Sequence, residues 1–447
     1  MQGLARNLGC GLVFLVVAVV GHGLDLSAAE WPQWRGPDGQ GHAQATNLPE
    51  KFGDAENCVW KVAVPGRGWS SPVIDGDSIW MTTAIEAPIT EEEKKKRLEG
   101  NSNNQPLNVA GKVSLRAVCV DRTSGAIRQN VELIAEDAPQ PIHQLNSFAS
   151  PSPVLVDGKL VAHFGTSGTA CLDTKTGIVL WTNRDLKINH ENGPGSTPIV
   201  WKDVVIIHLD GSDTQSIVGL DLGTGQVKWK TPRSGALNAD PQLKKAYGTP
   251  LVTEWNGQPA VLSPAADWLY AYNPATGAEL WKLSYGVLGF SIVPRPVLGD
   301  GMLYLSTSFI RPEMLAIRLG ATPEIAWRVK KQAPSMPSPL LVGGELYLFA
   351  DIGVASCLDA KTGEVRWAER LGGNFCSSPL LADGKIFVGN REGVVSVLAP
   401  GTQYRLLAAN PLDGAVMASP AAVGSSLYIR TEKSLYRIEA GKQTAAK

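Results

Sequence analysis

The stretch LDAKTGEVRW, Leu358 to Trp367, decides the fold of this chain. It predicts the end of one strand, a tight turn at Thr362-Gly363 and the start of a second strand that carries Trp367. Recurrence of one such hairpin along a chain indicates a repeat architecture. The same ten-residue frame recurs as LDTKTGIVLW from Leu172, LDLGTGQVKW from Leu220, YNPATGAELW from Tyr272 and, more weakly, RLGATPEIAW from Arg318.

A second feature recurs in phase with this frame: a Ser/Thr-Pro pair that leads into an apolar strand. Proline is tolerated there, because the first residue of a strand can lack a ladder donor. Each unit of roughly 40 to 50 residues then predicts four short antiparallel strands, the pattern of a propeller blade. Arg295-Pro296 is the odd member, and the other units begin at Pro72, Pro153, Pro198, Pro250, Pro339, Pro379 and Pro420.

These eight units predict an all-β fold, an eight-bladed β-propeller of four-stranded antiparallel blades. The unit that begins at Pro420 supplies only three strands before the chain ends. The segment NCVWKVAVP, residues 57–65, resembles the tryptophan-containing strands of the other units. We therefore expect the ring to be closed by this N-terminal strand, which would pair edges that are otherwise exposed.

The N-terminal residues 1–29 read as a signal peptide, with Arg6, an apolar core at 11–20 and a cleavage site at Ser27-Ala28-Ala29. The apolar core is short for a membrane span, although an anchor that stays attached is the alternative. We expect an exported protein, periplasmic or extracellular within the cell envelope. The remaining divisions are an N-terminal arm at 30–56, the propeller at 57–440 and a C-terminal tail at 441–447.

Two irregular segments stand outside the repeats. WPQWRGPDGQG, residues 31–41, is too rich in Trp, Pro and Gly for a regular element. We interpret it as an ordered arm whose Trp rings pack on the propeller surface, with ligand binding as the alternative. An insertion at 86–109 predicts a short exposed helix, because Thr90 and Glu93 have capping-box spacing and Glu91 precedes Lys95 by one turn.

Charge and cysteine usage limit the function classes. The net charge is −1, so no strongly basic face invites nucleic acid. Cleavage of the signal would leave an odd number of cysteines, which cannot pair fully. Cys119, Cys171 and Cys357 share one repeat position. We expect them to pack between blades as small hydrophobic residues.

The loops that precede the inner strands, called mouth loops below, should converge on one end of the central channel. Their Gly, Asn and Ser could equally satisfy turn geometry. No catalytic residue or metal-ligand set is predicted, and HLDGSDTQ at 208–215 is interpreted as a turn. The candidate ligand-binding residues at this mouth are Arg67, Trp69, His143, Asn146, His190, Glu191, Asn192, Arg295 and Asn374.

The repeated frame resembles the tryptophan-docking motif of pyrroloquinoline quinone (PQQ) repeats, found in eight-bladed quinoprotein dehydrogenases and BamB-type scaffolds. The opening WPQWRGPDGQG, with KAYGTP, VPRP and LGGNF, is similar to exported bacterial PQQ-like propeller proteins. The resemblance spans residues 57–440, and Gln129 and Leu407 depart from it. It implies turn glycines at Gly177, Gly225, Gly277 and Gly363, and blade-docking tryptophans at Trp60, Trp181, Trp229, Trp281, Trp327 and Trp367.

The resemblance leaves three functions open. The first is a non-catalytic scaffold or binding propeller, BamB-like, with an unidentified envelope protein or small polar ligand as partner. The others are a PQQ-dependent quinoprotein oxidoreductase and a carbohydrate- or peptide-binding sensor. The resemblance to the dehydrogenases would imply a disulfide between adjacent cysteines over the quinone and a calcium site of Glu, Asn and Asp. No two cysteines of this chain are adjacent, and only Glu191 and Asn192 resemble fragments of such a calcium site, so we expect no cofactor. We also expect a monomer that touches a membrane only through an uncleaved signal.

Overall fold

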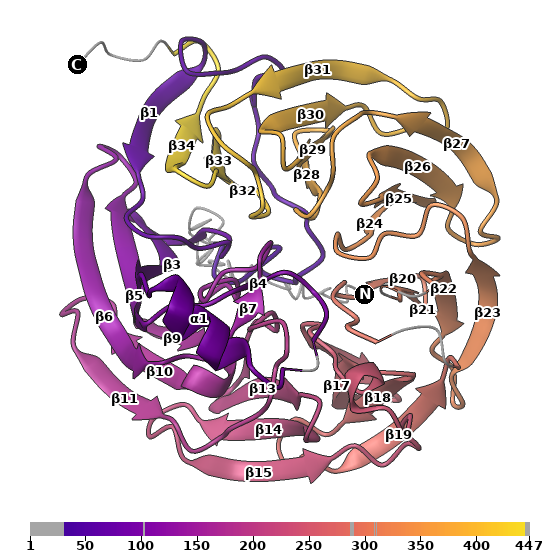
Figure 1. The fold of residues 1–447 in the computed structure, drawn as a ribbon. Coiled ribbons are helices and arrows are strands. Elements are labelled where there is room, and N and C mark those ends of the chain that lie inside the picture. Colours follow the sequence, from indigo (N-terminus) through magenta and orange to yellow (C-terminus); the bar gives the residue numbers. More distant parts are fainter. Residues whose placement is uncertain (1–30, 102, 287–289, 308, 310, 443–447) are drawn as a thin grey trace, which may run out of the picture.

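Eight four-stranded antiparallel sheets stand in a ring around a central channel (Figure 1), which confirms the predicted propeller. This computed structural model describes residues 31–101, 103–286, 290–307, 309 and 311–442. The predicted signal peptide therefore lies outside the described residues. None of the helices in the described ranges is long and apolar enough to cross a membrane.

Blades 1 to 4 follow one another along the chain, each running from the channel outward. Blade 1 contains β2 (Val73–Asp75), β3 (Ser78–Ala87), β5 (Lys112–Asp121) and β6 (Ile127–Asp137). Blade 2 contains β8 (Val154–Val156), β9 (Lys159–His163), β10 (Thr169–Asp173) and β11 (Val179–Asn183). Blade 3 contains β12 (Ile199–Trp201), β13 (Val204–Asp210), β14 (Gln215–Asp221) and β15 (Val227–Pro232). Blade 4 contains β16 (Leu251–Trp255), β17 (Gln258–Pro264), β18 (Trp268–Tyr272) and β19 (Glu279–Ser284).

Blades 5 to 8 repeat the arrangement. Blade 5 contains β20 (Val297–Gly299), β21 (Met302–Ser306), β22 (Met314–Arg318) and β23 (Glu324–Val329). Blade 6 contains β24 (Leu340–Val342), β25 (Glu345–Phe349), β26 (Val354–Asp359) and β27 (Val365–Arg370). Blade 7 contains β28 (Leu380–Ala382), β29 (Lys385–Gly389), β30 (Val394–Leu398) and β31 (Leu406–Pro411). Blade 8 contains β32 (Ala421–Val423), β33 (Ser426–Arg430), β34 (Ser434–Ile438) and β1 (Cys58–Ala63).

The last blade joins the two ends of the described chain. Strand β1 pairs antiparallel with β34, with Trp60 opposite Arg437, and the two strands lie side by side in Figure 1. The N-terminal strand thus closes the ring as predicted. Closure pairs the outer edge of β34, which would otherwise offer a free ladder for aggregation.

Docked tryptophans join the blades on the outside. Trp229 of blade 3 donates its indole N–H to the carbonyl oxygen of Pro274 in blade 4, at 3.2 Å. Its ring lies against Gly277, where an added Cβ would come within 2.4 Å of the indole. The motif glycine therefore both makes the turn at positive φ and admits the neighbouring ring. Equivalent indole-to-carbonyl bonds are made by Trp60, Trp181, Trp327 and Trp367.

Three junctions differ from this pattern, and the one between blades 7 and 8 has no tryptophan, because Leu407 and Ala408 stand at this point of β31. Gln129 replaces Trp, yet its side-chain amide donates to the carbonyl oxygen of Thr174 at 3.1 Å, so the cross-blade bond survives. At the junction of blades 4 and 5, Pro323 takes the place of the turn glycine. The buried Trp281 indole N–H then has no partner within the described chain, and Trp255 donates across this junction to Gly320 instead.

Hydroxyl groups join the blades on the inside. The Ser or Thr before each inner-strand proline accepts a hydrogen bond from the backbone N–H at the same position of the preceding blade. Seven such bonds, 2.8 to 3.1 Å long, run around the channel and close from Ser419 to Ser71. Arg295 carries no hydroxyl and interrupts this hydroxyl ring at blade 5.

Residues 31–43 of the N-terminal arm lie along the inner strands at the channel, so the prediction that the Trp rings pack on the propeller surface was wrong. The arm then continues over blade 7, where Leu48 and Phe52 bind Asp383 and Asn410. Trp31 is 2% exposed and exchanges two backbone hydrogen bonds with Ile74 of β2. Further along, Ala43 donates to Leu381 of β28. Each inner strand has an unpaired backbone edge toward the channel, and the arm satisfies several of these edges.

The insertion in blade 1 forms the predicted helix α1 (Glu91–Leu98), whose N-terminus is capped by the Thr90 hydroxyl. The ion pair in its first turn joins Lys94 to Glu91 at 3.9 Å, one residue short of the predicted spacing. Arg97 donates to the carbonyl oxygens of Ala110 and Pro139 and ties the helix to the blade. The other short elements are β4 (Leu107–Asn108), which pairs with β7 (Ile142–His143), and the 3-10 turns η1 (Gly165–Ser167) and η2 (Pro241–Leu243).

Cysteines at one repeat position fill the space between blades. Cys119, Cys171 and Cys357 lie on the third strand of their blades, are buried and form no disulfide. Burial raises the pKa of the Cys171 and Cys357 thiols to about 11, so they stay neutral. These thiols are small apolar packing groups, as predicted.

The docking geometry predicts unequal costs for two equivalent substitutions. Trp367→Ala should lower the free energy of unfolding by about 3–5 kcal/mol, because it empties a large aromatic site between blades 6 and 7. Gln129→Ala removes one hydrogen bond and should cost about 1 kcal/mol. Chemical denaturation of both variants measures the difference. Equal losses would contradict the assignment of blade packing to the tryptophan ring.

Candidate functional site

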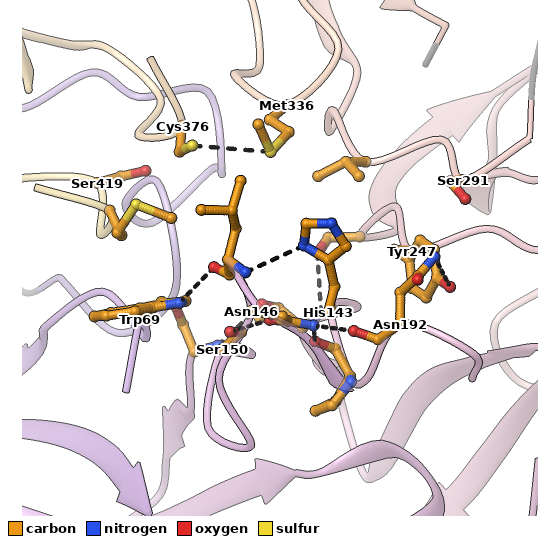
Figure 2. Close-up of a pocket in the computed structure, with 18 of the residues that line it drawn as sticks. Trp69, His143, Asn146, Ser150, Asn192, Tyr247, Ser291, Met336, Cys376 and Ser419 are labelled. Carbon is orange, nitrogen blue, oxygen red and sulfur yellow. Dashed lines mark hydrogen bonds between the residues drawn. The ribbon is translucent and has the colours of Figure 1, made fainter. Parts of the chain in front are cut away.

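The mouth loops surround a cavity of about 350 Å³ at one end of the channel (Figure 2). One repeat position supplies its wall: the third residue before the proline that opens each inner strand. All eight blades contribute that residue, so the wall is a ring of equivalent positions. In blade order, these wall residues are Trp69, Ser150, Gly195, Tyr247, Val293, Met336, Cys376 and Met417.

The base of the cavity is formed by the hydroxyl ring and the arm. The ring lies two residues further along each inner strand, and Ser71, Thr197 and Ser419 are among its members that line the cavity. Trp34 of the arm also lines it and donates its indole N–H to the Ser419 hydroxyl at 3.2 Å. The base is therefore held by the same bonds that hold the blades together.

The predicted residues Asn146 and Asn192 line the cavity and brace neighbouring blades. Asn146 donates its amide to the carbonyl oxygens of Asn192 at 2.8 Å and Pro194 at 3.1 Å. Asn192 in turn donates to the Tyr247 hydroxyl at 3.4 Å, and that hydroxyl donates to the carbonyl oxygen of His190 at 2.5 Å. Their amides fix the loops of blades 2, 3 and 4 relative to one another.

The predicted residues Trp69 and His143 also line the cavity. Both bind the backbone of Leu145: the Trp69 indole donates to its carbonyl oxygen at 2.9 Å, and His143 Nδ1 accepts from its N–H at 3.1 Å. Since Nδ1 accepts, the neutral ring carries its proton on Nε2. Burial lowers the pKa of His143, which keeps the ring neutral and a hydrogen-bond donor.

His190 and Glu191 lie behind the wall instead of facing the cavity. His190 is 6% exposed, and its Nε2 accepts a hydrogen bond from the backbone N–H of Thr166 at 2.8 Å. The carboxylate of Glu191 accepts from the Ser212 hydroxyl at 2.9 Å. Both side chains hold their mouth loop, residues 190–196, against neighbouring turns.

The remaining predicted residues are separated from the cavity. Arg67 lies in an adjoining groove, with its guanidinium 5.1 Å from the Trp69 ring. Asn374 donates to Glu392 at 2.8 Å outside the cavity. Arg295 is 2% exposed and donates to the carbonyl oxygen of Trp34 at 3.0 Å, so it holds the arm in the channel.

Sequence reasoning favoured polar residues and missed the apolar ones that dominate the cavity. No Asp, Glu, Lys or Arg occurs among its described lining residues. A signal was present, because the third residue before each repeat proline can be read from the sequence. The lining residues that were missed include Trp34, Tyr247, Phe290, Phe309, Met336, Cys376 and Met417.

The cavity does not fit a quinone cofactor with its calcium ion. PQQ is a polycarboxylate and needs cationic partners, and calcium needs six to eight oxygen ligands. The described lining residues include neither Lys nor Arg nor carboxylate. Within the described ranges, no group of three or more His, Cys, Asp or Glu side chains is placed to hold a metal ion.

A closed ring of eight four-stranded blades, joined by docked tryptophans, defines a PQQ-like β-propeller. The chain belongs to the family described as "Outer membrane protein assembly factor BamB", whose profile matches residues 75–262 and 265–431. It is 28% identical over 170 residues to a protein of that name from Legionella pneumophila, covering 36% of this chain and 42% of that protein. It is 22% identical over 274 residues to "Tetrathionate hydrolase" from Acidithiobacillus ferrooxidans, covering 56% of this chain and 52% of that protein.

Solved structures share the fold at low sequence identity. The crystal structure of BamB from Moraxella catarrhalis superposes with a TM-score of 0.56 at 16% identity, over 85% of this chain and 99% of that one. A europium-containing methanol dehydrogenase gives a TM-score of 0.66 at 12% identity, over 90% of this chain and 89% of that one. The chain spans about half the length of the curated relatives it matches, and fold likeness does not transfer activity.

Buried histidines predict a loss of stability in acid. Burial lowers the pKa of His190 to about 4 and that of His163 to about 3, below the ordinary value of 6.5. Their contribution to the free energy of unfolding is complete above pH 6.5 and is lost as the pH falls toward these values. Burial also lowers the pKa of His208, which adds to this trend. It raises the pKa of Asp267 to about 6 and raises those of Glu86, Asp210 and Asp351, and these carboxyl groups oppose the trend.

We therefore expect the melting temperature to fall between pH 6.5 and pH 4. His163→Gln should flatten that fall, since Gln does not titrate. Thermal denaturation across this range checks both outcomes. A flat profile for the unmodified protein would show that the buried rings do not control acid stability.

Proposed function

We propose that the protein is a non-catalytic binding propeller of the cell envelope that holds an uncharged, apolar segment of a protein partner at the channel mouth. One observation carries the proposal: the eight wall residues converge on a cavity whose described lining residues carry no charge. Its volume of about 350 Å³ falls within the range of ligand sites, which are mostly apolar with a few polar groups. His143 and the base hydroxyls supply those polar groups.

The side chains at the cavity favour binding over catalysis. The base hydroxyls accept backbone N–H groups, and none of those described donates a hydrogen bond to a histidine or carboxylate that would activate it. Burial raises the pKa of the Cys376 thiol to about 12, so it is a weak nucleophile at neutral pH. His143 has no carboxylate among the described lining residues to orient it.

The place in the cell envelope rests on two observations. The apolar segment at 11–20 is typical of an export signal. The family and the relative from Legionella pneumophila carry the name of an outer membrane protein assembly factor. A protein partner fits this relationship, and the apolar cavity favours such a partner over a small polar ligand.

Photo-crosslinking within the cell envelope tests the partner proposal. A benzophenone side chain at Leu145, which lies at the rim and is 38% exposed, should form a discrete adduct with a partner protein. The same group at Ile178, exposed on the outside of blade 2, should not form it. Val293→Trp would fill the cavity from the wall and should abolish the adduct at Leu145 while leaving the fold intact.

Two outcomes would contradict the proposal. One is an equal adduct from Leu145 and Ile178, which would place the contact elsewhere on the ring. The other is an adduct that persists in Val293→Trp, which would show that the cavity itself receives nothing. The melting temperature of Val293→Trp is the control for folding.

Quinone binding is a separate test, because the structural relatives include a dehydrogenase. We expect that the purified protein, mixed with PQQ and calcium, shows neither stoichiometric binding by absorbance nor dye-linked oxidation of alcohols or aldoses. Among the lining residues that the structure describes, none offers the quinone carboxylates a cationic partner. Stoichiometric binding with turnover would replace the binding proposal by a quinoprotein oxidoreductase, and binding without turnover would favour a sensor.

A further inference from the structure

Three neighbouring positions of the cavity wall carry sulfur. Met336, Cys376 and Met417 occupy the same repeat position in blades 6, 7 and 8, and all three line the cavity. The Cys376 thiol donates a hydrogen bond to the Met336 Sδ atom at 3.8 Å, across the junction of two blades (Figure 2). The other five wall positions hold Trp, Ser, Gly, Tyr and Val, so sulfur is confined to one arc of the ring.

We propose that this sulfur arc is a binding site for a soft monovalent cation, Cu(I), held by the Cys376 thiolate and the thioethers of Met336 and Met417. Thiolate and thioether groups select Cu(I) over harder ions. Zinc–sulfur bonds are about 2.3 Å long, and we take the same length for Cu(I). Two sulfur atoms on one ion, at an angle of about 110–120°, therefore lie about 3.8–4.0 Å apart, which the observed separation matches.

Charge balance points to a monovalent ion. Binding breaks the S–H bond of Cys376, releases its proton to solvent and forms a sulfur–metal bond, with no electron transferred. The thiolate and the ion then sum to zero charge, as the thiol did before. A divalent ion would leave a net charge in a cavity whose described lining residues offer no carboxylate to neutralise it.

The position of Cys376 distinguishes it from other cysteines. Cys119, Cys171 and Cys357 are buried between blades, at most 2% exposed. Cys376 is partly exposed and lines the cavity. The sulfur arc does not depend on the partner proposal, since it rests on wall chemistry alone.

Competition for Cu(I) tests the site on the full chain. The reduced protein, without oxygen, is titrated against bathocuproine disulfonate as a chelator of Cu(I). We expect one tightly bound ion and one released proton per chain. Cys376→Ser should abolish both, and Met336→Leu and Met417→Leu should each weaken binding about tenfold or more. Leu preserves the volume of Met, so these variants should fold.

Matched controls are Cys171→Ser and Met314→Leu, which alter buried sulfur outside the cavity and should bind like the unmodified protein. Ag(I) gives a second readout that needs no chelator: it should raise the melting temperature of the unmodified protein and not that of Cys376→Ser. Unchanged affinity in both Met variants would overturn the proposal, because it would indicate a bare thiol. Equal loss in a control variant would overturn it as well.

Discussion

A proline directly precedes each inner strand, and in seven of the eight blades the N–H of the residue before that proline finds its acceptor in the next blade. Seven hydroxyls accept these bonds at 2.8 to 3.1 Å. The positions are buried, Ser338 and Ser378 among them. A missing acceptor there would leave a buried donor unsatisfied at a cost of about 1–3 kcal/mol. The hydroxyl ring therefore fixes the blades, and with them the wall two residues away, independently of the side chain that the wall carries.

The one gap in the hydroxyl ring is coupled to the arm. Arg295 replaces the hydroxyl, and its guanidinium extends to the arm carbonyl of Trp34. Gly39 packs so closely that an added Cβ would lie 2.2 Å from that guanidinium. Burial lowers the pKa of Arg295 to about 10 and that of Arg35 to about 9, yet both stay charged at neutral pH. Backbone carbonyls of the arm solvate these two charges, so blade 5 and the arm stabilise each other.

The parts of the fold that could be predicted are those that the repeat encodes locally. The recurring prolines indicated the blade count, the turn glycines and tryptophans indicated the blade hairpins, and Trp60 indicated the closure. The position of the arm could not be predicted, because its partners Ile74 and Leu381 are joined to it only through the finished channel. At the site, the mouth loops were predicted, but His190 and Glu191, which were predicted to bind a ligand, lie behind the wall and brace the loops. The wall position holds residues as different as Trp69, Gly195 and Cys376, so composition conceals it and only superposed repeats reveal it.

The fold thus requires no particular residue at the wall position. The side chains found there therefore reflect the ligand that the cavity binds. Charged side chains such as Arg67, Arg391 and Glu392 lie in the adjoining groove, while the described lining of the cavity is neutral. A charged ligand that entered would lose its hydration without gaining a partner. An uncharged protein segment avoids this loss of hydration, and it can pack against the aromatic part of the wall at Trp69 and Tyr247. A monovalent cation that displaces the Cys376 proton at the sulfur arc also avoids an unpaired charge, because the site is as neutral after binding as before.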